Sequence, residues 1–203
     1  AETVLKVDLF ISNKSFGFGK KFFIDGFKKE FISSFLIFLI DNNLEVISSK
    51  KKLKCWTSFQ NRYNLATSKL KSEIKLKSIG KINLVDCMML WHRDKKYYSN
   101  NWRGKYSSDG GVLTNQAIHL LDTLIFNFGK ISNFDVYADF NKNKLQAEDL
   151  ILINFRHENG ILSSFKATTR ANKNYRSAID VVGEKGRIIV KGISLNTFSK
   201  FKK

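Results

Sequence analysis

The amino-acid sequence predicts an α+β domain from about residue 80 onward, with a mostly antiparallel open sheet and helices on one face. Two tight turns carry this prediction, because Asn159-Gly160 and Lys185-Gly186 each separate two apolar, strand-like runs. Consecutive hairpins make antiparallel neighbours and cannot form a parallel sheet. An amphipathic helix between Gly110 and Gly129 supplies the layer that covers the sheet.

The elements follow one another in an order that fits this class. Ahead of the sheet, the sequence indicates a short strand at Leu53 to Phe59 and a helix from Asn64 to Ile79 that Gly80 ends. A long strand from Ile82 to Trp91 leads into a polar, aromatic loop, His92 to Ser108. The helix that Gly110 and Gly111 open has apolar residues at helical spacing, at Leu113, Ala117, Leu120, Leu121, Leu124 and Phe128. The remaining strands are expected at Phe134 to Phe140, Leu150 to Arg156, Ile161 to Thr168, Ala178 to Val182 and Arg187 to Val190.

Length and composition narrow the class of protein. A chain of 203 residues with 43% hydrophobic content can bury one good core. The net charge of +17 comes from 28 Lys and only 7 Arg, so the planar guanidinium that reads bases and phosphates is scarce, and no nucleic-acid partner is expected. The longest apolar run, Phe31 to Ile40, is well short of the roughly 20 residues that a spanning helix needs, so no membrane partner is expected. Cys55 and Cys87 are isolated in apolar runs, which indicates free thiols in a reducing compartment, the cytoplasm, and no metal site.

The most informative stretch of the sequence runs from Trp102 to Asp122. Within it, Asn115 and His119 are four residues apart and His119 and Asp122 are three apart, so a helix would stack them as neighbours. A carboxylate beside the imidazole could set its tautomer and leave the other ring nitrogen free to exchange a proton. A structural hydrogen-bonded pair has the same spacing, and the spacing alone leaves both interpretations open.

This stretch resembles the signature of the Gfo/Idh/MocA oxidoreductases, the family of glucose-fructose oxidoreductase and inositol dehydrogenase. The signature is carried by Trp102-Arg103-Gly104, Asp109-Gly110-Gly111 and Asn115 to Asp122. Further matches follow in order within residues 53 to 192, at Gln60-Asn61-Arg62-Tyr63, Ile79-Gly80-Lys81-Ile82, Glu148-Asp149, Asn159-Gly160 and Val182 to Gly186. The Asn-Gln-Ala-x-His form and the loop from Tyr97 to Arg103 look most like the branch that oxidises UDP-linked aminosugar uronates.

The resemblance implies a dehydrogenase that passes hydride between a sugar carbon and NAD or NADP. His119 matches the active-site histidine, which moves the hydroxyl proton. Asn115 stands where many members have an Asp, so it could hold the substrate by hydrogen bonds but could not act as an acid or base. Trp102 and Arg103 match a pair near the nicotinamide and are expected to bind the cofactor.

The resemblance also implies a substrate and an assembly. The expected substrate is a sugar or a UDP-sugar, and the family's pairing of sheet faces implies a homo-oligomer. The expected substrate contacts are Arg62, His92, Arg93, Tyr98 and Asp122. For Arg62 and Arg93 a surface ion pair stays open as the alternative, and for Trp102 simple packing does.

Residues 1 to 60 are expected to be a degenerate remnant of a dinucleotide-binding (Rossmann) domain, and residues 61 to 203 the sugar-binding and dimerisation domain. Gly17-Phe18-Gly19 lacks the third glycine of the fingerprint that cradles a pyrophosphate. Gly19 to Gly26 can be laid on the family's segment that ends at the catalytic lysine, which puts Gly26 in the place of that lysine. Loss of a proton-transfer group removes about 10² to 10⁴ in rate. This chain alone is therefore expected to be inactive and to bind neither NAD nor NADP tightly.

Two alternatives to an inactive enzyme half stay open. A partner chain could supply the nucleotide-binding half. The chain could also be a non-catalytic sugar-binding or dimerisation module that uses the open face of its sheet.

Overall fold

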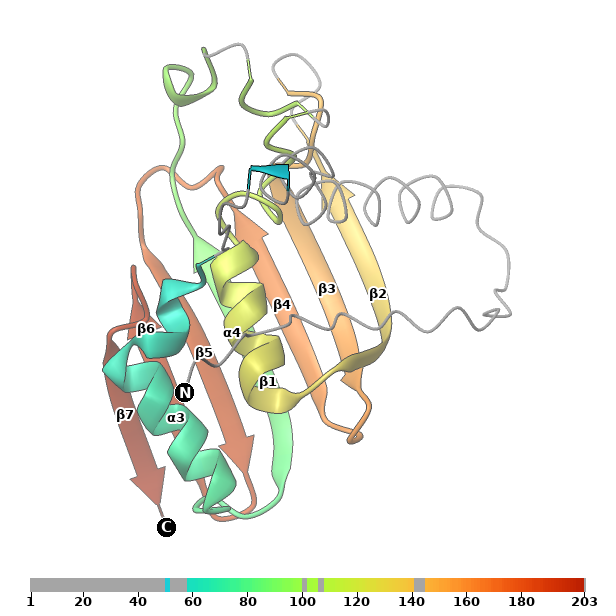
Figure 1. Ribbon diagram of the computed structural model, residues 1–203. Helices are drawn as coiled ribbons and strands as arrows, with labels where there is room; N and C mark the ends of the chain where they lie inside the picture. The colour runs from blue at the N-terminus through green and yellow to red at the C-terminus, as the bar shows by residue number, and fades with distance from the viewer. Residues whose placement is uncertain (1–49, 52–57, 100–101, 106–107, 141–144, 203) are drawn as a thin grey trace.

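A computed structural model describes residues 50–51, 58–99, 102–105, 108–140 and 145–202 (Figure 1). The helices and strands are η1 (Gln60–Tyr63), α3 (Leu65–Lys75), β1 (Ile82–Leu90), η2 (Tyr97–Ser99), α4 (Ile118–Phe128), β2 (Ile131–Asp139), β3 (Leu150–His157), β4 (Leu162–Thr168), β5 (Arg176–Gly183), β6 (Gly186–Gly192) and β7 (Thr197–Lys202). The predicted remnant at residues 1–60 falls almost wholly outside the described residues, as do Gly17 to Gly26 and Cys55. The predicted strand at 53–59 also lies mostly outside them, and its described residues Ser58 and Phe59 belong to no strand.

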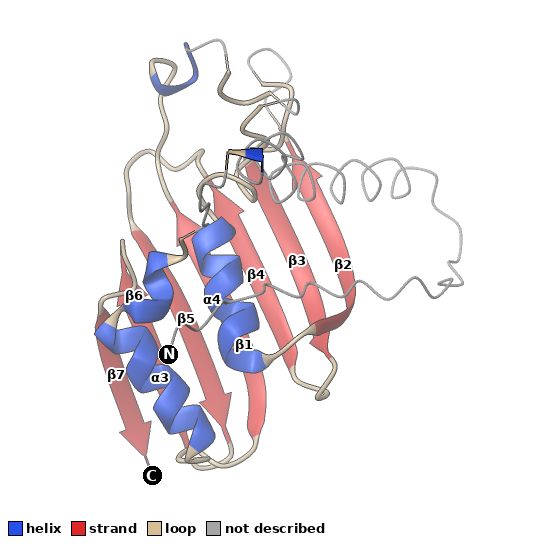
Figure 2. Cartoon of the chain, in the orientation of Figure 1, coloured by secondary structure: helices blue, strands red, loops and turns tan. Residues whose placement is uncertain are grey.

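One seven-stranded sheet forms the body of the domain, in the order β2-β3-β4-β1-β5-β6-β7. All neighbouring strands are antiparallel except β1 and β4, which are parallel. The chain between β1 and β4 contains α4 and the β2–β3 hairpin, the kind of long connection that a parallel pair requires. Both helices lie on the same face of the sheet, α3 over β6 and β7 and α4 over β1 (Figure 2). The α+β prediction, with helices on one face, is therefore confirmed.

The core fills the space between this face and the two helices. Alternate residues of the central strand β1 point into it, and Val85, Cys87 and Met89 are fully buried. From the helices it receives Leu70 of α3 and Leu124 of α4. Burial raises the pKa of the Cys87 thiol well above its ordinary range, so this cysteine is an inert apolar side chain.

The two predicted hairpins exist, with turns that differ in detail. In the first, Gly160 has a φ of +84°, but Asn159 does not share the positive φ that a two-residue turn would require of both. His157 pairs with Ile161 across a three-residue loop, in which the Asn159 side chain accepts a hydrogen bond from the Ile161 N–H. In the second hairpin, Gly183 pairs with Gly186, so the turn residues are 184 and 185, one position earlier than predicted.

Both predicted helices are shorter than their sequence patterns indicated. The helix α3 ends at Lys75 rather than Ile79, because Lys77 adopts a φ of +50° and the N–H groups of Lys77 and Ser78 close the last turn on the carbonyls of Ile74 and Glu73. The final strand, β7, was not predicted. Its Lys200 pairs with Glu73 of α3, which ties the last strand to the helix layer.

The helix α4 begins at Ile118, not at Gly111. The residues before it wind through turns, and Glu148 binds two of their N–H groups. The Val112 N–H donates to the Glu148 carbonyl (2.7 Å) and the Leu113 N–H donates to the Glu148 carboxyl (3.1 Å). The prediction that Asn115 shares a helix with His119 is therefore wrong.

No helix in the described part of the chain is long and apolar enough to cross a membrane. Within the same residues, no group of His, Cys, Asp and Glu side chains is arranged to hold a metal ion.

Candidate active site

His119 lies in the first turn of α4, half-buried. Its ring meets the edge of the Phe59 ring, with 6.0 Å between centroids and planes at 74°. The Nδ1 atom is buried and has no hydrogen-bond partner among the described residues. Burial lowers the pKa of His119, while the charge of Asp122 acts in the opposite direction. The balance favours a neutral imidazole, the form that can accept a proton.

Asp122 stands one helical turn after His119 but is directed to a different partner. Its two carboxylate oxygens are both bound by the guanidinium of Arg62, with the Arg62 Nε atom 2.8 Å from Asp122 Oδ2. Both side chains are largely buried, at 15% and 8% exposure. The Arg62 guanidinium also lies over two rings, 5.5 Å from the centroid of Phe59 and 5.1 Å from that of Phe126. The structure thus joins two predicted substrate contacts to each other in a buried, bidentate ion pair.

Asn115 is held in the turns that precede α4. Its Nδ2 atom donates to Asp109 Oδ2 (2.7 Å), and the other oxygen of Asp109 accepts from the Gly104 N–H (2.7 Å). Asp109 thereby ties this segment to the loop of Trp102 and Arg103. Burial raises the pKa of Asp109, an effect that its hydrogen bonds from Asn115 and from backbone N–H groups oppose.

The loop between β1 and α4 stacks arginines on aromatic rings. The Arg93 guanidinium lies 4.9 Å from the ring of Trp91 and 5.2 Å from that of Tyr97. The Arg103 guanidinium lies 4.0 Å from the ring of Tyr97 and 5.0 Å from that of Trp102. Neither guanidinium pairs with a carboxylate within the described part of the chain, and Arg103 Nε is buried without a partner there. Two uncompensated, pre-positioned guanidinium groups are suited to hold an anion.

The remaining predicted site residues flank this loop. His92 donates through Nδ1 to the Ala171 carbonyl (2.6 Å), which fixes its ring against the segment after β4. The Tyr98 hydroxyl lies 2.8 Å from Thr169 Oγ1, and burial raises the pKa of Tyr98. Sequence analysis did not single out Gln116, whose Nε2 donates to the Tyr97 hydroxyl (2.8 Å) and so connects the start of α4 to the arginine loop. Its only sequence signal is its place in the Asn-Gln-Ala-x-His run.

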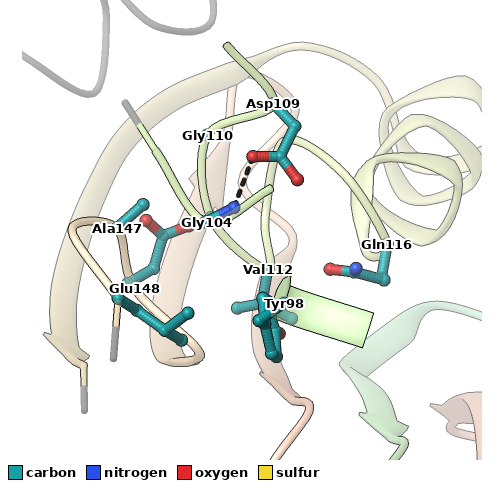
Figure 3. A pocket seen from close by; sticks show the side chains of 10 residues that line it. Tyr98, Gly104, Asp109, Gly110, Val112, Gln116, Ala147 and Glu148 are labelled. Carbon is teal, nitrogen blue, oxygen red and sulfur yellow. Dashed lines mark hydrogen bonds between the residues drawn. The ribbon is translucent and has the colours of Figure 1, made fainter. Parts of the chain in front are cut away.

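A small hollow lies beside this region, lined mainly by the turns of residues 104 to 112 and by residues 145 to 148. It has no room for even a water molecule, so it is not a pocket for a small molecule. Of the predicted site residues only Tyr98 lines it, and His119 does not. Figure 3 shows Asp109 and Glu148 as the two carboxyl groups beside it, with Asp109 bonded to Gly104. We interpret this hollow as packing space around the Glu148 carboxyl and place the candidate site at His119 and the arginine loop.

The sheet, its helix layer and these side chains define a class of protein: an α+β domain that presents a histidine at a helix start beside an arginine-rich aromatic loop. The chain matches the family model of the GFO/IDH/MocA C-terminal domain over residues 67–189. It belongs to the Gfo/Idh/MocA oxidoreductase family, as the resemblance of its sequence motifs predicted. No curated protein matches the chain.

Solved dehydrogenases share this fold. The WlbA dehydrogenase from Bordetella pertussis, in complex with NADH and UDP-GlcNAcA, is 28% identical with a TM-score of 0.71, over 79% of this chain and 51% of that one. The WlbA dehydrogenase from Chromobacterium violaceum, in complex with the same two ligands, is 29% identical with a TM-score of 0.70, over 76% and 46%. A levoglucosan dehydrogenase in complex with NADH is alike in fold, at 22% identity and a TM-score of 0.63, over 70% and 41%. The chain spans about half the length of these relatives.

Proposed function

We propose that this chain is the sugar-binding half of an NAD(P)-dependent oxidoreductase that oxidises a hydroxyl group of a sugar or nucleotide sugar. The observation that carries the proposal is His119, half-buried at the start of α4 with its pKa lowered by burial; the sequence resemblance matches it to the family's active-site histidine. The two relatives solved with NADH and UDP-GlcNAcA support a nucleotide sugar as substrate.

The proposed role of His119 is to accept the hydroxyl proton. When bound, the nicotinamide takes the hydride from the sugar carbon. His119 Nε2 receives the proton, since Nδ1 is enclosed beside the core and has no route to a substrate. Asn115, held by Asp109, would orient the sugar through its amide.

The arginine loop fits an anionic ligand. Arg93 and Arg103 carry guanidinium groups that no described carboxylate neutralises, and a nucleotide-sugar acid brings a diphosphate and a carboxylate. We assign Arg93, His92 and Tyr98 to the substrate and Trp102 with Arg103 to the cofactor. The exposed Trp102 ring offers a flat surface beside a cation, which suits a nicotinamide or nucleotide ring.

The second proposed function is self-association through the sheet face that carries no helix, called here the open face. Six large apolar side chains are exposed on it: Leu84, Tyr137, Leu152, Leu162, Val182 and Phe201. They alternate along their strands with the buried core positions, and cross-strand pairs such as Leu84–Val182 and Tyr137–Leu152 make them neighbours. Charged side chains lie among them, including the ion pairs Asp86–Lys166 and Asp180–Arg187, so this face mixes apolar and charged groups. Such a mixed face suits self-association with a second copy of the chain. The free, buried Cys87 supports a reducing location, the cytoplasm.

A sedimentation experiment tests the oligomer. Leu152→Lys should convert a dimer to a monomer, because it replaces an exposed apolar side chain of the open face by a charge. Leu65→Lys makes the same change at an exposed leucine of α3, away from the open face. It serves as the control and should leave the dimer intact. A wild-type chain that sediments as a monomer at high concentration would contradict the proposal.

A domain graft tests the oxidoreductase function. A nucleotide-binding domain with an intact glycine fingerprint and the catalytic lysine is joined ahead of residue 61, and NADH formation is followed with UDP-sugar acids. Turnover by the graft and none by these 203 residues alone is the expected result. A folded graft that binds NAD and a nucleotide sugar without turnover would favour the non-catalytic module.

A further inference from the structure

The charge balance around His119 depends on Arg62, a residue expected from the sequence to contact substrate. The charged and titratable groups of the elements around α4 are few. Asp122 comes from α4 itself, Arg62 from η1, Lys71 from α3 and the inert Cys87 from β1. Lys71 is engaged with the Phe126 carbonyl and ring. Asp122 is therefore the only described carboxylate close enough to act on His119, and Arg62 is its only described counterion.

The geometry shows where the Asp122 charge is directed. Both of its oxygens are bound by the Arg62 guanidinium, and His119 Nδ1 donates no hydrogen bond to either. The guanidinium cannot move toward solvent easily, because it lies against the rings of Phe59 and Phe126. Phe59 in turn makes a T-shaped contact with the His119 ring. One cation thus fixes the acid, packs on the ring beside the histidine, and anchors η1 to α4.

We infer that Arg62 is a positioning residue that withholds Asp122 from His119, so that the histidine of the proposed site stays neutral with its Nδ1 atom unpaired. This inference rests on the proposed function only for the role of His119. The arrangement differs from a carboxylate–imidazole pair, in which Asp122 would bond Nδ1 directly and stabilise the cation. Without Arg62, a largely buried carboxylate would lack its counterion, and the imidazolium one turn away and the Lys71 ammonium near Arg62 would be the cations available to it.

The titration of the three histidines by NMR tests this directly in the full chain. In Arg62→Met, the apparent pKa of His119 should rise by about 1 unit or more, which is the usual effect of an unshielded carboxylate at this range. His92 and His157 should titrate as in the wild type. The double variant Arg62→Met/Asp122→Asn should bring the His119 value back down.

A matched control and a second variant complete the test. Arg187→Met removes an arginine from an exposed ion pair with Asp180 on the sheet and should leave His119 unchanged. If Arg62→Met does not give a folded spectrum, Arg62→Lys decides: a lysine keeps the positive charge but has no planar fork to bind both oxygens of Asp122, so the His119 pKa should still rise, by less than in Arg62→Met.

An unchanged His119 titration in folded Arg62→Met, or in folded Arg62→Lys, would overturn the inference. Neither measurement involves turnover. An inactive domain graft would therefore refute the proposed function and leave this result standing, and the reverse also holds.

Discussion

Glu148 allows a specific prediction about the pH dependence of stability, because its carboxyl is buried and hydrogen-bonded to the turns before α4. It accepts a hydrogen bond from the Leu113 N–H and fills the space beside Gly111, where any Cβ would overlap it. Burial, with smaller contributions from the charges of Asp149 and Asp109, raises its pKa from an ordinary 4.5 to about 7. The perturbation is Glu148→Gln, which keeps the oxygen that accepts from Leu113 and removes the titration.

The sign and size of the effect follow from that shift. A carboxyl whose pKa is raised on folding binds its proton more tightly in the native state, so its contribution to stability is fully present below 4.5 and is lost as the pH rises through about 7. A shift of this size, at about 1.4 kcal/mol per unit, amounts to about 3 kcal/mol. Between pH 5 and pH 8, the free energy of unfolding of Glu148→Gln should therefore rise by about 2 to 3 kcal/mol relative to the wild type.

Urea unfolding at pH 5, 6, 7 and 8 measures this difference, with Glu158→Gln at an exposed glutamate as the control. The control should follow the wild type at every pH. Parallel curves for Glu148→Gln and wild type would refute the reasoning, since they would mean that Glu148 is ionised at the same pH in both the folded and the unfolded state.

Three further predictions concern the rest of the domain. Burial lowers the pKa of His157 below its ordinary 6.5, so its stabilising contribution is present above pH 6.5 and is lost as the pH falls through the lowered pKa. In urea titrations, His157→Gln should therefore lose less stability than the wild type between pH 7 and pH 5. An equal loss would contradict this. Leu124→Ala, at a fully buried position of α4, should cost about 2 to 5 kcal/mol in chemical unfolding, and a cost below 1 kcal/mol would mean that the site collapses around the cavity. Gly111→Ala should destabilise the domain by overlap with Glu148, and Glu148→Ala added to it should recover part of the loss in a double-mutant cycle; strictly additive losses would show that the two residues do not interact.

The sheet was predictable because its signals are local. Alternating apolar runs separated by Asn159-Gly160 and by the turn before Gly186 sufficed to define four of its strands as two hairpins. The strand β7 was missed because its sequence is short and carries Lys200 on the inward face, where only the distant Glu73 makes a lysine acceptable. No local pattern contains that partner.

The limits of α4 show the same division between local and distant causes. The apolar spacing of the helix is read correctly from Ile118 to Phe128. Its start was placed too early because the apolar spacing continues back to Leu113, whereas these residues form turns bound to Glu148, some 35 residues further along the chain. Similarly, Gly80 was predicted to end α3, but Lys77 has the left-handed backbone conformation at the end of this helix.

For the candidate site, the sequence spacing predicted that His119 and Asp122 share a helix, but not the partners of their side chains. The spacing of His119 and Asp122 on one helix is correct, and the two are coupled electrostatically. The spacing could not show that Arg62, 60 residues earlier, binds both oxygens of Asp122. Family motifs identify which side chains meet, while the pairing among them depends on packing that only the folded chain defines.

The central claim is that His119 accepts the substrate proton when a nucleotide-binding domain completes the enzyme. The most direct measurement is the turnover number of His119→Ala in the domain graft, with a UDP-sugar acid and saturating NAD. The account predicts a loss of about 10² or more in kcat, since the proton acceptor is removed, while Lys75→Ala on the exposed side of α3 retains full activity. A folded His119→Ala graft with an unchanged kcat would contradict the account and leave His119 a structural residue.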